Sequence, residues 1–489
     1  MPWAGWHREP AEERGPVADL EARVPEEPDS DHGGWQGRHP PDNSIASRLD
    51  VRSTDSVTNP YLLRPVTDGE FAAWARMIAD TYGSDRSDEE LARARAATEL
   101  DRTIAAFDGD TPVGGTAVYT RSLTVPGAVL PVAGVTWVGV APTHRRRGIL
   151  TSLTRKQLTD LHECDGEPIA ALRPSEAAIY GRFGYGPATR GSQLRCDKRS
   201  MRFRPGTDFG GGTIQLLDRD TARPSIEKVY DQVRTVSVAW PDRAERFWNN
   251  RLDDAPHARG GATSLRHAVH RAPDGDITGY ALYRINDARD PLGNDTSAVR
   301  VVELAATTRQ AYASLWRFLA GIDLVPWIEY EAAVDEPLPH LLTEPRAVRS
   351  TVVDRLWVRL VDVGRALAGR RYSAPLDVVL TVEDDFCPWN TGRYRLQTEG
   401  DAVDCERTNA PADLQLTAAE LAAAYLGGTT NTRRLLASCP VRTDSWPSAI
   451  SRSRPSTCQA MATDRRMRST TGSRPRTRLV WRQEKSRLR

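Results

Sequence analysis

The sequence has few cysteines, no long apolar run and almost no net charge. Its 6 cysteines are scattered through 489 residues without a C-x-x-C pair. This usage predicts reduced thiols in a cytosolic protein and excludes a disulfide framework. No stretch approaches the roughly 18 apolar residues that a transmembrane helix needs. The first residues lack the apolar core of a signal peptide, so we expect neither a membrane span nor a signal peptide.

The low charge and the absence of two motifs narrow the possible functions further. A formal net charge of +1 argues against a surface committed as a whole to nucleic acid. Neither G-x-x-x-x-G-K-[S/T] nor G-x-G-x-x-G occurs, which leaves little support for a nucleotide hydrolase or a Rossmann enzyme. His267 and His270 lie three residues apart, but no cysteine or acidic residue completes a metal-binding spacing. We therefore predict no metal and no specific nucleic-acid partner.

Composition divides the chain into five segments. Residues 1–59 are rich in Pro, Gly and charged residues, which predicts a disordered leader or a start codon set too early. Residues 60–200 and 201–345 each mix helical and strand patterns, as in a mixed α/β fold. Residues 346–438 form a third such unit. Residues 439–489 are dominated by Arg, Ser, Thr and Pro, and we expect a basic disordered tail.

The stretch W-V-G-V-A-P-T-H-R-R-R-G-I-L at residues 137–150 stands out. An apolar strand ends at Pro142, a turn with three arginines follows, and a helix begins after Gly148. The first turn of a helix has backbone N–H groups without intrahelical partners, and the helix dipole adds positive charge. The arrangement therefore predicts a diphosphate site. The competing interpretation is a solvated basic turn.

The second unit repeats this outline without its basic turn. Residues 299–315 read V-R-V-V-E-L-A-A-T-T-R-Q-A-Y-A-S-L, again a strand followed by a helix. The turn has no glycine, and its only arginine is Arg309. If the second unit is an internal duplicate of the first, its phosphate site is lost.

A second motif, L-R-P-S-E-A-A-I-Y-G-R-F-G-Y-G at residues 172–186, makes a family recognisable. With residues 137–150, it resembles the Eis (enhanced intracellular survival) family of actinobacterial GNAT N-acetyltransferases. The resemblance covers residues 61–438, including D-R-L-W-V-R at 354–359 and A-A-Y-L-G-G at 423–428. It implies tandem GNAT-like domains, the second inactive, then a sterol-carrier-like domain, assembled as a homohexamer.

The resemblance also implies roles for individual residues. The backbone of a splayed strand would bind the pantetheine arm of acetyl-CoA, and its residues are Val138, Gly139 and Val140. The diphosphate would lie against the turn and the following helix, at Arg146, Arg147, Gly148, Ile149, Leu150 and Thr151. Ser175 and Glu176 would line the other side of the co-substrate, and Tyr180 matches the general acid.

The chemistry of acetyl transfer to an amine fits these residue types. The departing thiolate, with a conjugate pKa of about 8.5, needs only modest acid help, and a tyrosine hydroxyl at Tyr180 can give it. The alternative for Tyr180 is a packed aromatic beside Phe183 and Tyr185. A backbone N–H near Val138 or Gly139 would stabilise the oxyanion.

Four further residues are candidates for lesser roles. Asp80 and Asp85 could hold a cationic amine substrate, although a solvated helix end explains them equally well. Arg145 and His144 could support the phosphate site from behind.

The general base is the part of the resemblance that fits least well. In the family the base is the carboxylate of the last residue, usually aromatic. Here the last residue is Arg489, at the end of a basic tail unlike the family's ending. Either the base is altered, or residues 439–489 come from a shifted reading frame. In the second case we expect weak or absent activity.

Two functions from different classes therefore remain. The first is an acetyl-CoA-dependent N-acetyltransferase acting through a ternary complex on an aminoglycoside-like amine or a lysine side chain. The alternative is a non-catalytic ligand- or lipid-binding protein with a vestigial acetyl-CoA site.

Overall fold

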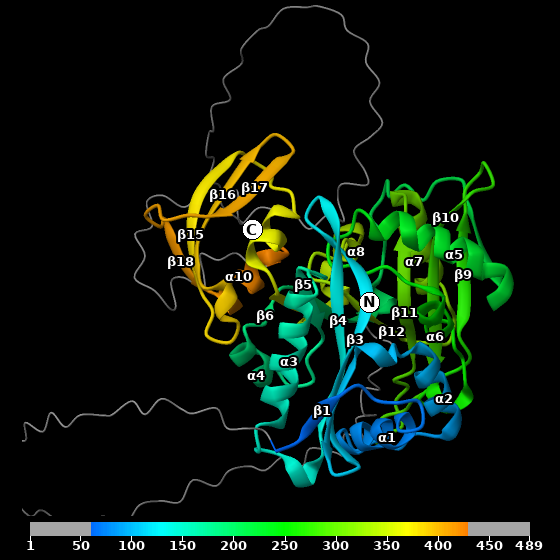
Figure 1. Cartoon of the computed structure of the whole chain (residues 1–489). Coiled ribbons are helices and arrows are strands. Elements are labelled where there is room, and N and C mark those ends of the chain that lie inside the picture. The colour runs from blue at the N-terminus through cyan, green and yellow to red at the C-terminus, as the bar shows by residue number, and fades with distance from the viewer. Residues whose placement is uncertain (1–59, 429–489) are drawn as a thin grey trace, which may run out of the picture.

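The computed structural model describes residues 60–428. The predictions for residues 1–59 and for the tail with Arg489 lie outside the described residues. Across residues 60–428 the chain forms two seven-stranded sheets and one four-stranded sheet, with helices packed against them. In the view of Figure 1 the four-stranded sheet lies to the left of the first sheet and the second seven-stranded sheet to its right. The predicted mixed α/β class is confirmed.

The first sheet has the strand order β1-β2-β3-β4-β5-β14-β6. Its strands are β1 Leu62–Arg64, β2 Thr103–Asp108, β3 Thr111–Val125, β4 Ala128–Val140, β5 Ile169–Leu172, β14 Trp357–Leu360 and β6 Gly186–Pro187. Four helices accompany it: α1 Phe71–Thr81, α2 Asp88–Ala97, α3 Ile149–Glu163 and α4 Ala177–Tyr180. Apolar side chains on one face of α3, such as Leu153 and Leu158, are fully buried, as their helical spacing predicts.

The polar residues just before α1, Thr67 and Asp68, are plausible side-chain caps, but neither caps the helix. Glu70 occupies the N-cap position, and no side chain caps the helix. Both side chains are engaged elsewhere: the Asp68 carboxylate accepts from Arg95 at 2.5 Å, and the Thr67 hydroxyl donates to Glu70 at 2.7 Å. By contrast, Ser87 and Glu90 form a complete capping box at the start of α2.

The second sheet has the order β13-β7-β12-β11-β10-β9-β8. Its strands are β7 Arg190–Asp197, β8 Thr213–Leu217, β9 Arg266–Arg271, β10 Ile277–Asn286, β11 Ala298–Ala306, β12 Trp327–Ala333 and β13 Val348–Asp354. Its helices are α5 Arg219–Arg234, α6 Glu245–Arg251, α7 Arg309–Ala320 and α8 Leu338–Leu341.

Two strands lie in sheets that chain order does not predict. β7 lies within the predicted first unit, residues 60–200, but it pairs with β12 and β13 of the second sheet. In return, β14 enters the first sheet between β5 and β6. All four residues of β14 are buried. Chain order alone cannot predict such an exchange, because both pairings are between segments far apart in sequence.

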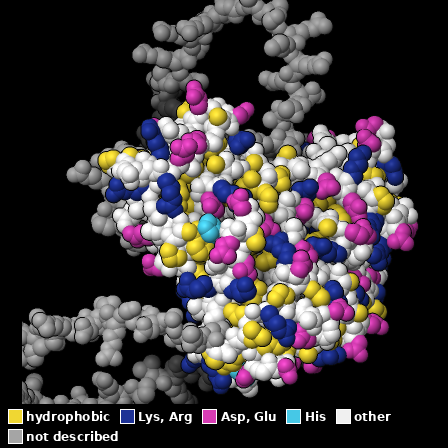
Figure 2. Space-filling view, in the orientation of Figure 1, with side chains coloured by type: hydrophobic (Ala, Val, Ile, Leu, Met, Phe, Trp, Pro, Cys, Tyr) yellow, Lys and Arg dark blue, Asp and Glu magenta, His cyan; other side chains and the backbone are white. Residues whose placement is uncertain are grey.

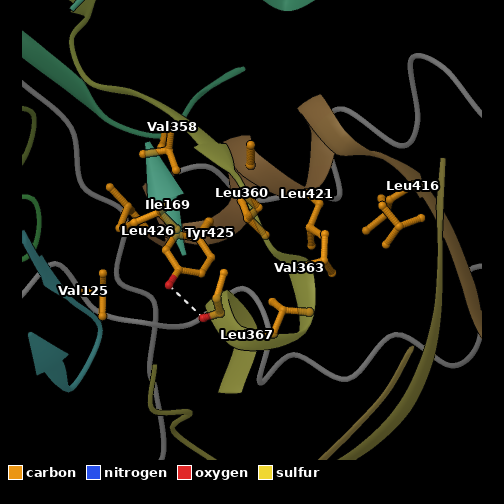
Figure 3. Packing of buried hydrophobic residues seen from close by; sticks show 14 of the residues in the cluster. Val125, Ile169, Val358, Leu360, Val363, Leu367, Leu416, Leu421, Tyr425 and Leu426 are labelled. Carbon is orange, nitrogen blue, oxygen red and sulfur yellow. Dashed lines mark hydrogen bonds between the residues drawn. The ribbon is translucent and has the colours of Figure 1, made fainter. Parts of the chain in front are cut away.

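The third unit packs directly on the first. Its sheet has the order β17-β16-β15-β18, and its strands are β15 Leu376–Glu383, β16 Gly392–Glu399, β17 Ala402–Arg407 and β18 Leu414–Thr417. Its helices are α9 Val363–Ala368 and α10 Ala418–Tyr425. Figure 3 shows Ile169 of β5 and Val358 of β14 in one cluster with Tyr425 and Leu421 of α10. The first and third units therefore share a hydrophobic core.

No helix within residues 60–428 is long and apolar enough to cross a membrane.

Candidate active site

A β-bulge opens the first sheet at the end of β4. Gly115 of β3 is opposite Gly139, but Ala117 is opposite Thr136, so β4 has one residue more than β3 between these pairs. Trp137 takes up the bulge with a left-handed backbone, φ 55°. On the other side, β4 pairs with β5 only from Val132 to Gly134. Beyond Gly134, the remaining residues of β4 have no partner in β5, which ends at Leu172, and we call the β5 side of this unpaired stretch the opening.

The backbone of Val138 and Val140 faces this opening. Ala141 donates its N–H to the carbonyl of Val113 on β3 at 2.9 Å. Because backbone groups alternate sides along a strand, Gly139 also faces β3, while Val138 and Val140 face away from it. Of the two amides predicted for the oxyanion, the structure directs that of Val138 toward the opening and that of Gly139 toward β3.

The N-terminus of α3 lies next to the end of β4 and is not capped by a side chain. Gly148 at the N-cap has φ 79°, a left-handed conformation that glycine adopts without steric cost. Arg146 is also left-handed, at φ 62°. The first backbone bond of the helix runs from the Ser152 N–H to the Gly148 carbonyl at 3.0 Å. The N–H groups of the first turn thus point out of the helix without a side-chain acceptor.

The side chains around this turn are exposed. Arg145, Arg146, Arg147, Gly148 and Thr151 are exposed, Leu150 is half-buried, and Ile149 is buried. Arg147 donates to the hydroxyl of Tyr61 at 3.2 Å. His144 contacts the Asp108 carboxylate at 3.2 Å, so it supports the turn from the β2–β3 end.

Tyr180 lies at the end of α4, buried to 7% exposure. Its ring meets that of Tyr185 edge to face, with 5.8 Å between centroids. Burial raises the pKa of the Tyr180 hydroxyl well above its usual value, and the nearby Tyr82, Tyr185 and Glu176 raise it further. The hydroxyl therefore keeps its proton at neutral pH.

Tyr82 joins the two sides of the opening, and sequence reasoning did not single it out. Its hydroxyl donates to the Val138 carbonyl at 2.6 Å, and the Ser175 side chain hydrogen-bonds the same hydroxyl. Ser175 and Glu176 are exposed in the loop between β5 and α4. The structure thus gathers Val138, Ser175, Glu176 and Tyr180 around Tyr82.

Asp80 and Asp85 lie near this group at the end of α1 and in the loop after it. Both are exposed, and within residues 60–428 neither forms an ion pair. Between them and the bulge, the guanidinium of Arg86 lies over the Trp137 ring at 5.0 Å. Their position leaves the substrate role open as a prediction.

In the second unit the start of the equivalent helix is capped by a side chain. β11 and β12 pair in parallel from Ala298 to Val301, and α7 follows β11 as α3 follows β4. Here, however, the Thr308 side chain caps the helix by accepting from the Ala311 N–H at 3.1 Å. The carboxylate of Asp208 also lies near this end, accepting from Gln310 at 2.7 Å. A diphosphate would compete with both groups.

Comparison with protein families matches all three units. One family model of an acetyltransferase (GNAT) domain matches residues 63–188, and a second model of such a domain matches residues 239–360. A sterol carrier protein domain model matches residues 363–437. These matches confirm two GNAT domains followed by a sterol-carrier-like domain.

Named relatives and solved structures agree with the family matches. An uncharacterized N-acetyltransferase of Streptomyces avermitilis is 39% identical over 371 residues, which are 75% of this chain and 90% of that protein. N-acetyltransferase Eis of Mycobacterium tuberculosis is 36% identical over 374 residues, 73% of this chain and 87% of that one. Eis1 of Mycobacterium abscessus has a crystal structure with a TM-score of 0.67 and 34% identity, covering 81% of this chain and 96% of its own.

A more distant structure shares the fold alone. It is a GCN5-related N-acetyltransferase from Anabaena variabilis, with a TM-score of 0.68 at 20% identity over 77% of this chain and 93% of that one. The bulged strand and the uncapped helix start at Gly148 agree with these relatives. The chain belongs to the Eis family of GNAT N-acetyltransferases, enzymes that use acetyl-CoA to acetylate amines.

Proposed function

We propose that this chain acetylates a primary amine of an aminoglycoside-like small molecule or of a lysine side chain. Acetyl-CoA and the amine bind together in a ternary complex, and Tyr180 acts as the general acid. The observation that carries the proposal is the opening between β4 and β5, which meets the uncapped end of α3 on one side and the Tyr82–Ser175–Tyr180 group on the other.

The residues around the opening fit acetyl-CoA. The exposed first turn of α3, with Gly148 and the neighbouring Arg146 and Arg147, would hold the diphosphate through backbone N–H groups and guanidinium charge. The outward backbone groups of Val138 and Val140 would bind the amide-bearing pantetheine arm. Bound there, acetyl-CoA supplies an activated acetyl thioester.

The chain's own groups can then assist the transfer. The Val138 N–H faces the opening and would hydrogen-bond the acetyl carbonyl oxygen as negative charge develops on it. The Tyr180 hydroxyl, which is protonated at neutral pH, would donate its proton to the departing sulfur. The base that takes the amine proton was predicted at the carboxylate of Arg489, which lies outside the described residues.

The charge at the rim favours a cationic acceptor. Asp80, Asp85 and Glu176 are exposed carboxylates on the two segments that border the opening. An amine substrate is positively charged before it reacts, so these carboxylates would raise its local concentration. In contrast, Figure 2 shows acidic and basic side chains interspersed over the visible face, which does not favour a nucleic-acid partner.

The experiment is initial-rate kinetics on the full chain with acetyl-CoA and three acceptors: an aminoglycoside, a lysine peptide and a neutral amine of similar size. A ternary complex predicts intersecting double-reciprocal lines, and acidic recognition predicts a higher kcat/KM for the cationic acceptors. Parallel lines would contradict the ternary complex. Acetyl-CoA binding without transfer to any of the amines would instead favour the ligand-binding alternative. The homohexamer is part of the same proposal and is tested by sedimentation of the chain.

A further inference from the structure

Arg359 is a fully buried charge at the junction of the first and third units. It lies on β14, the strand that directly precedes the third unit in the sequence, and its side chain is 0% exposed. Its guanidinium forms an ion pair with Asp384 at 2.5 Å, and the Asp384 side chain is 1% exposed. Burying two charges is costly, so the pair needs further hydrogen bonds to stabilise it.

The loop that carries Asp384 connects β15 to β16 and is fastened to β14. Asp384 accepts from the Cys387 N–H at 3.0 Å and from the Asn390 side chain at 3.1 Å. Asn390 in turn donates to the Val361 carbonyl at 3.2 Å, just after β14. The ion pair is therefore part of a connected polar network that fixes this loop of the sterol-carrier-like domain against the first sheet.

On its other side, the guanidinium of Arg359 contacts the turn that follows Tyr180. Gly184 has φ 79°, and a Cβ added there would lie 2.2 Å from Nη1 of Arg359, so the guanidinium touches the glycine backbone. The turn is short and closed, because Gly184 donates to the Gly181 carbonyl at 3.0 Å and Tyr185 donates to the Tyr180 carbonyl at 3.3 Å. A shift of Arg359 would therefore move the backbone of Tyr180.

The loop between β15 and β16 also contacts Phe183, close to Tyr180, through Phe386. The Phe386 ring packs on that of Phe183, with 5.0 Å between centroids. Arg155 of α3 donates to the Phe386 carbonyl at 3.1 Å and lies over its ring at 4.4 Å. The loop at residues 384–391 thus links α3, whose first turn would hold the diphosphate, with the turn after Tyr180.

We propose that Arg359 and Asp384 are positioning residues through which the sterol-carrier-like domain sets the place of the Tyr180 hydroxyl. The inference rests on the proposed role of Tyr180 as general acid. It gives the third domain a part in acetyl transfer that does not require a bound lipid. Neither residue touches the reacting atoms.

The test compares two acetyl donors on the full chain. Acetyl-CoA releases an alkyl thiolate that benefits from a proton, whereas an acetyl thioester of a thiophenol releases a weaker base that needs little acid help. Tyr180→Phe should lower kcat/KM about 100-fold with acetyl-CoA and only a few-fold with the thiophenol ester. Asp384→Asn should show the same selectivity, with a loss of about 10-fold on acetyl-CoA. Arg359→Lys, which keeps the charge, should recover part of the activity that Arg359→Met loses.

Glu303→Gln is the matched control. Glu303 forms an equally buried ion pair with Arg243 at 2.8 Å, with both side chains 2% exposed, but in the second unit. Glu303→Gln should lower the stability of the fold, and any loss of kcat/KM should be the same with both acetyl donors. If Asp384→Asn does not fold, the double variant Arg359→Met with Asp384→Leu removes both charges together, which commonly preserves stability.

Equal losses with both donors in a folded Asp384 or Arg359 variant would overturn the positioning role. Asp384→Asn combined with Tyr180→Phe should lose no more acetyl-CoA activity than Tyr180→Phe alone, and an additive loss would also overturn the inference. If Tyr180→Phe itself lacks donor selectivity, the acid assignment fails and the inference fails with it. That result is distinguishable, because it appears in the Tyr180 variant alone.

Discussion

The hydroxyl of Tyr82 donates to the carbonyl of Val138 at 2.6 Å, across 56 residues of sequence. Since the Ser175 side chain hydrogen-bonds the same hydroxyl, Tyr82 spans the opening from the bulged strand to the loop before α4. The width of the opening at this point is therefore set by a tyrosine at the C-terminal end of α1.

Removing this hydroxyl should loosen the opening without unfolding the domain. In Tyr82→Phe, one partly exposed hydrogen bond worth about 1 kcal/mol is lost on each side of the opening. We expect acetyl-CoA to bind about 5- to 10-fold more weakly. Amide hydrogen exchange at residues 173–180 should become faster. Titration calorimetry and exchange measurements check both effects, and unchanged values in both would show that Tyr82 does not set the width.

The charge at the start of α3 can be tested at Gly148. A Cβ at this position meets nothing within 4 Å, so a substitution there costs only the strain of a left-handed backbone. Asparagine tolerates that conformation, whereas aspartate of the same shape adds a negative charge beside the proposed diphosphate. We expect Gly148→Asn to bind acetyl-CoA within a few-fold of the native chain and Gly148→Asp at least 10-fold more weakly. Equal affinity of the two variants would place the diphosphate elsewhere.

A half-buried carboxyl group in the second unit predicts how stability depends on pH. The pKa of Glu336 is raised to about 7, chiefly because burial disfavours the charged form; the hydrogen bond from the Tyr312 hydroxyl lowers it, and the charge of Asp335 adds to the rise. A raised folded-state pKa means that the folded chain holds this proton more tightly than the unfolded chain. The contribution to stability is full below the unfolded value of 4.5 and is lost as pH rises toward about 7.

Replacing this carboxyl with an amide should remove that pH dependence. Glu336→Gln should gain on the order of 2 kcal/mol relative to the native chain at about pH 8, and little or nothing at about pH 5. Urea unfolding at the two pH values measures the difference. Glu89→Gln, at an exposed position on α2, serves as the control. A gain of the same size at both pH values would contradict a half-buried, protonated Glu336.

The sequence predicted the end of a strand, a basic turn and the start of a helix at residues 137–150 because their signals are local. Apolar alternation marks β4, and Gly148 marks the helix start. The Tyr82–Val138 contact and the exchange of β7 and β14 could not be predicted, because each joins segments that only the folded chain brings together.

The sequence contains one signal for the contact between the first and third units. Arg359 stands in the apolar strand W-V-R-L of β14, and a charge in such a strand requires a buried partner. The sequence does not say which acidic residue that is. Asp384 becomes the partner only because the β15–β16 loop folds back on β14.

Tyr180, as the proposed general acid, should act on the chemical step and not on the binding of acetyl-CoA. The most direct measurement is kcat for acetyl transfer by Tyr180→Phe, beside the dissociation constant of acetyl-CoA for the same variant. We expect kcat to fall about 100-fold and the dissociation constant to stay within about 3-fold of the native value. A Tyr180→Phe variant that turns over at the native rate would contradict this role.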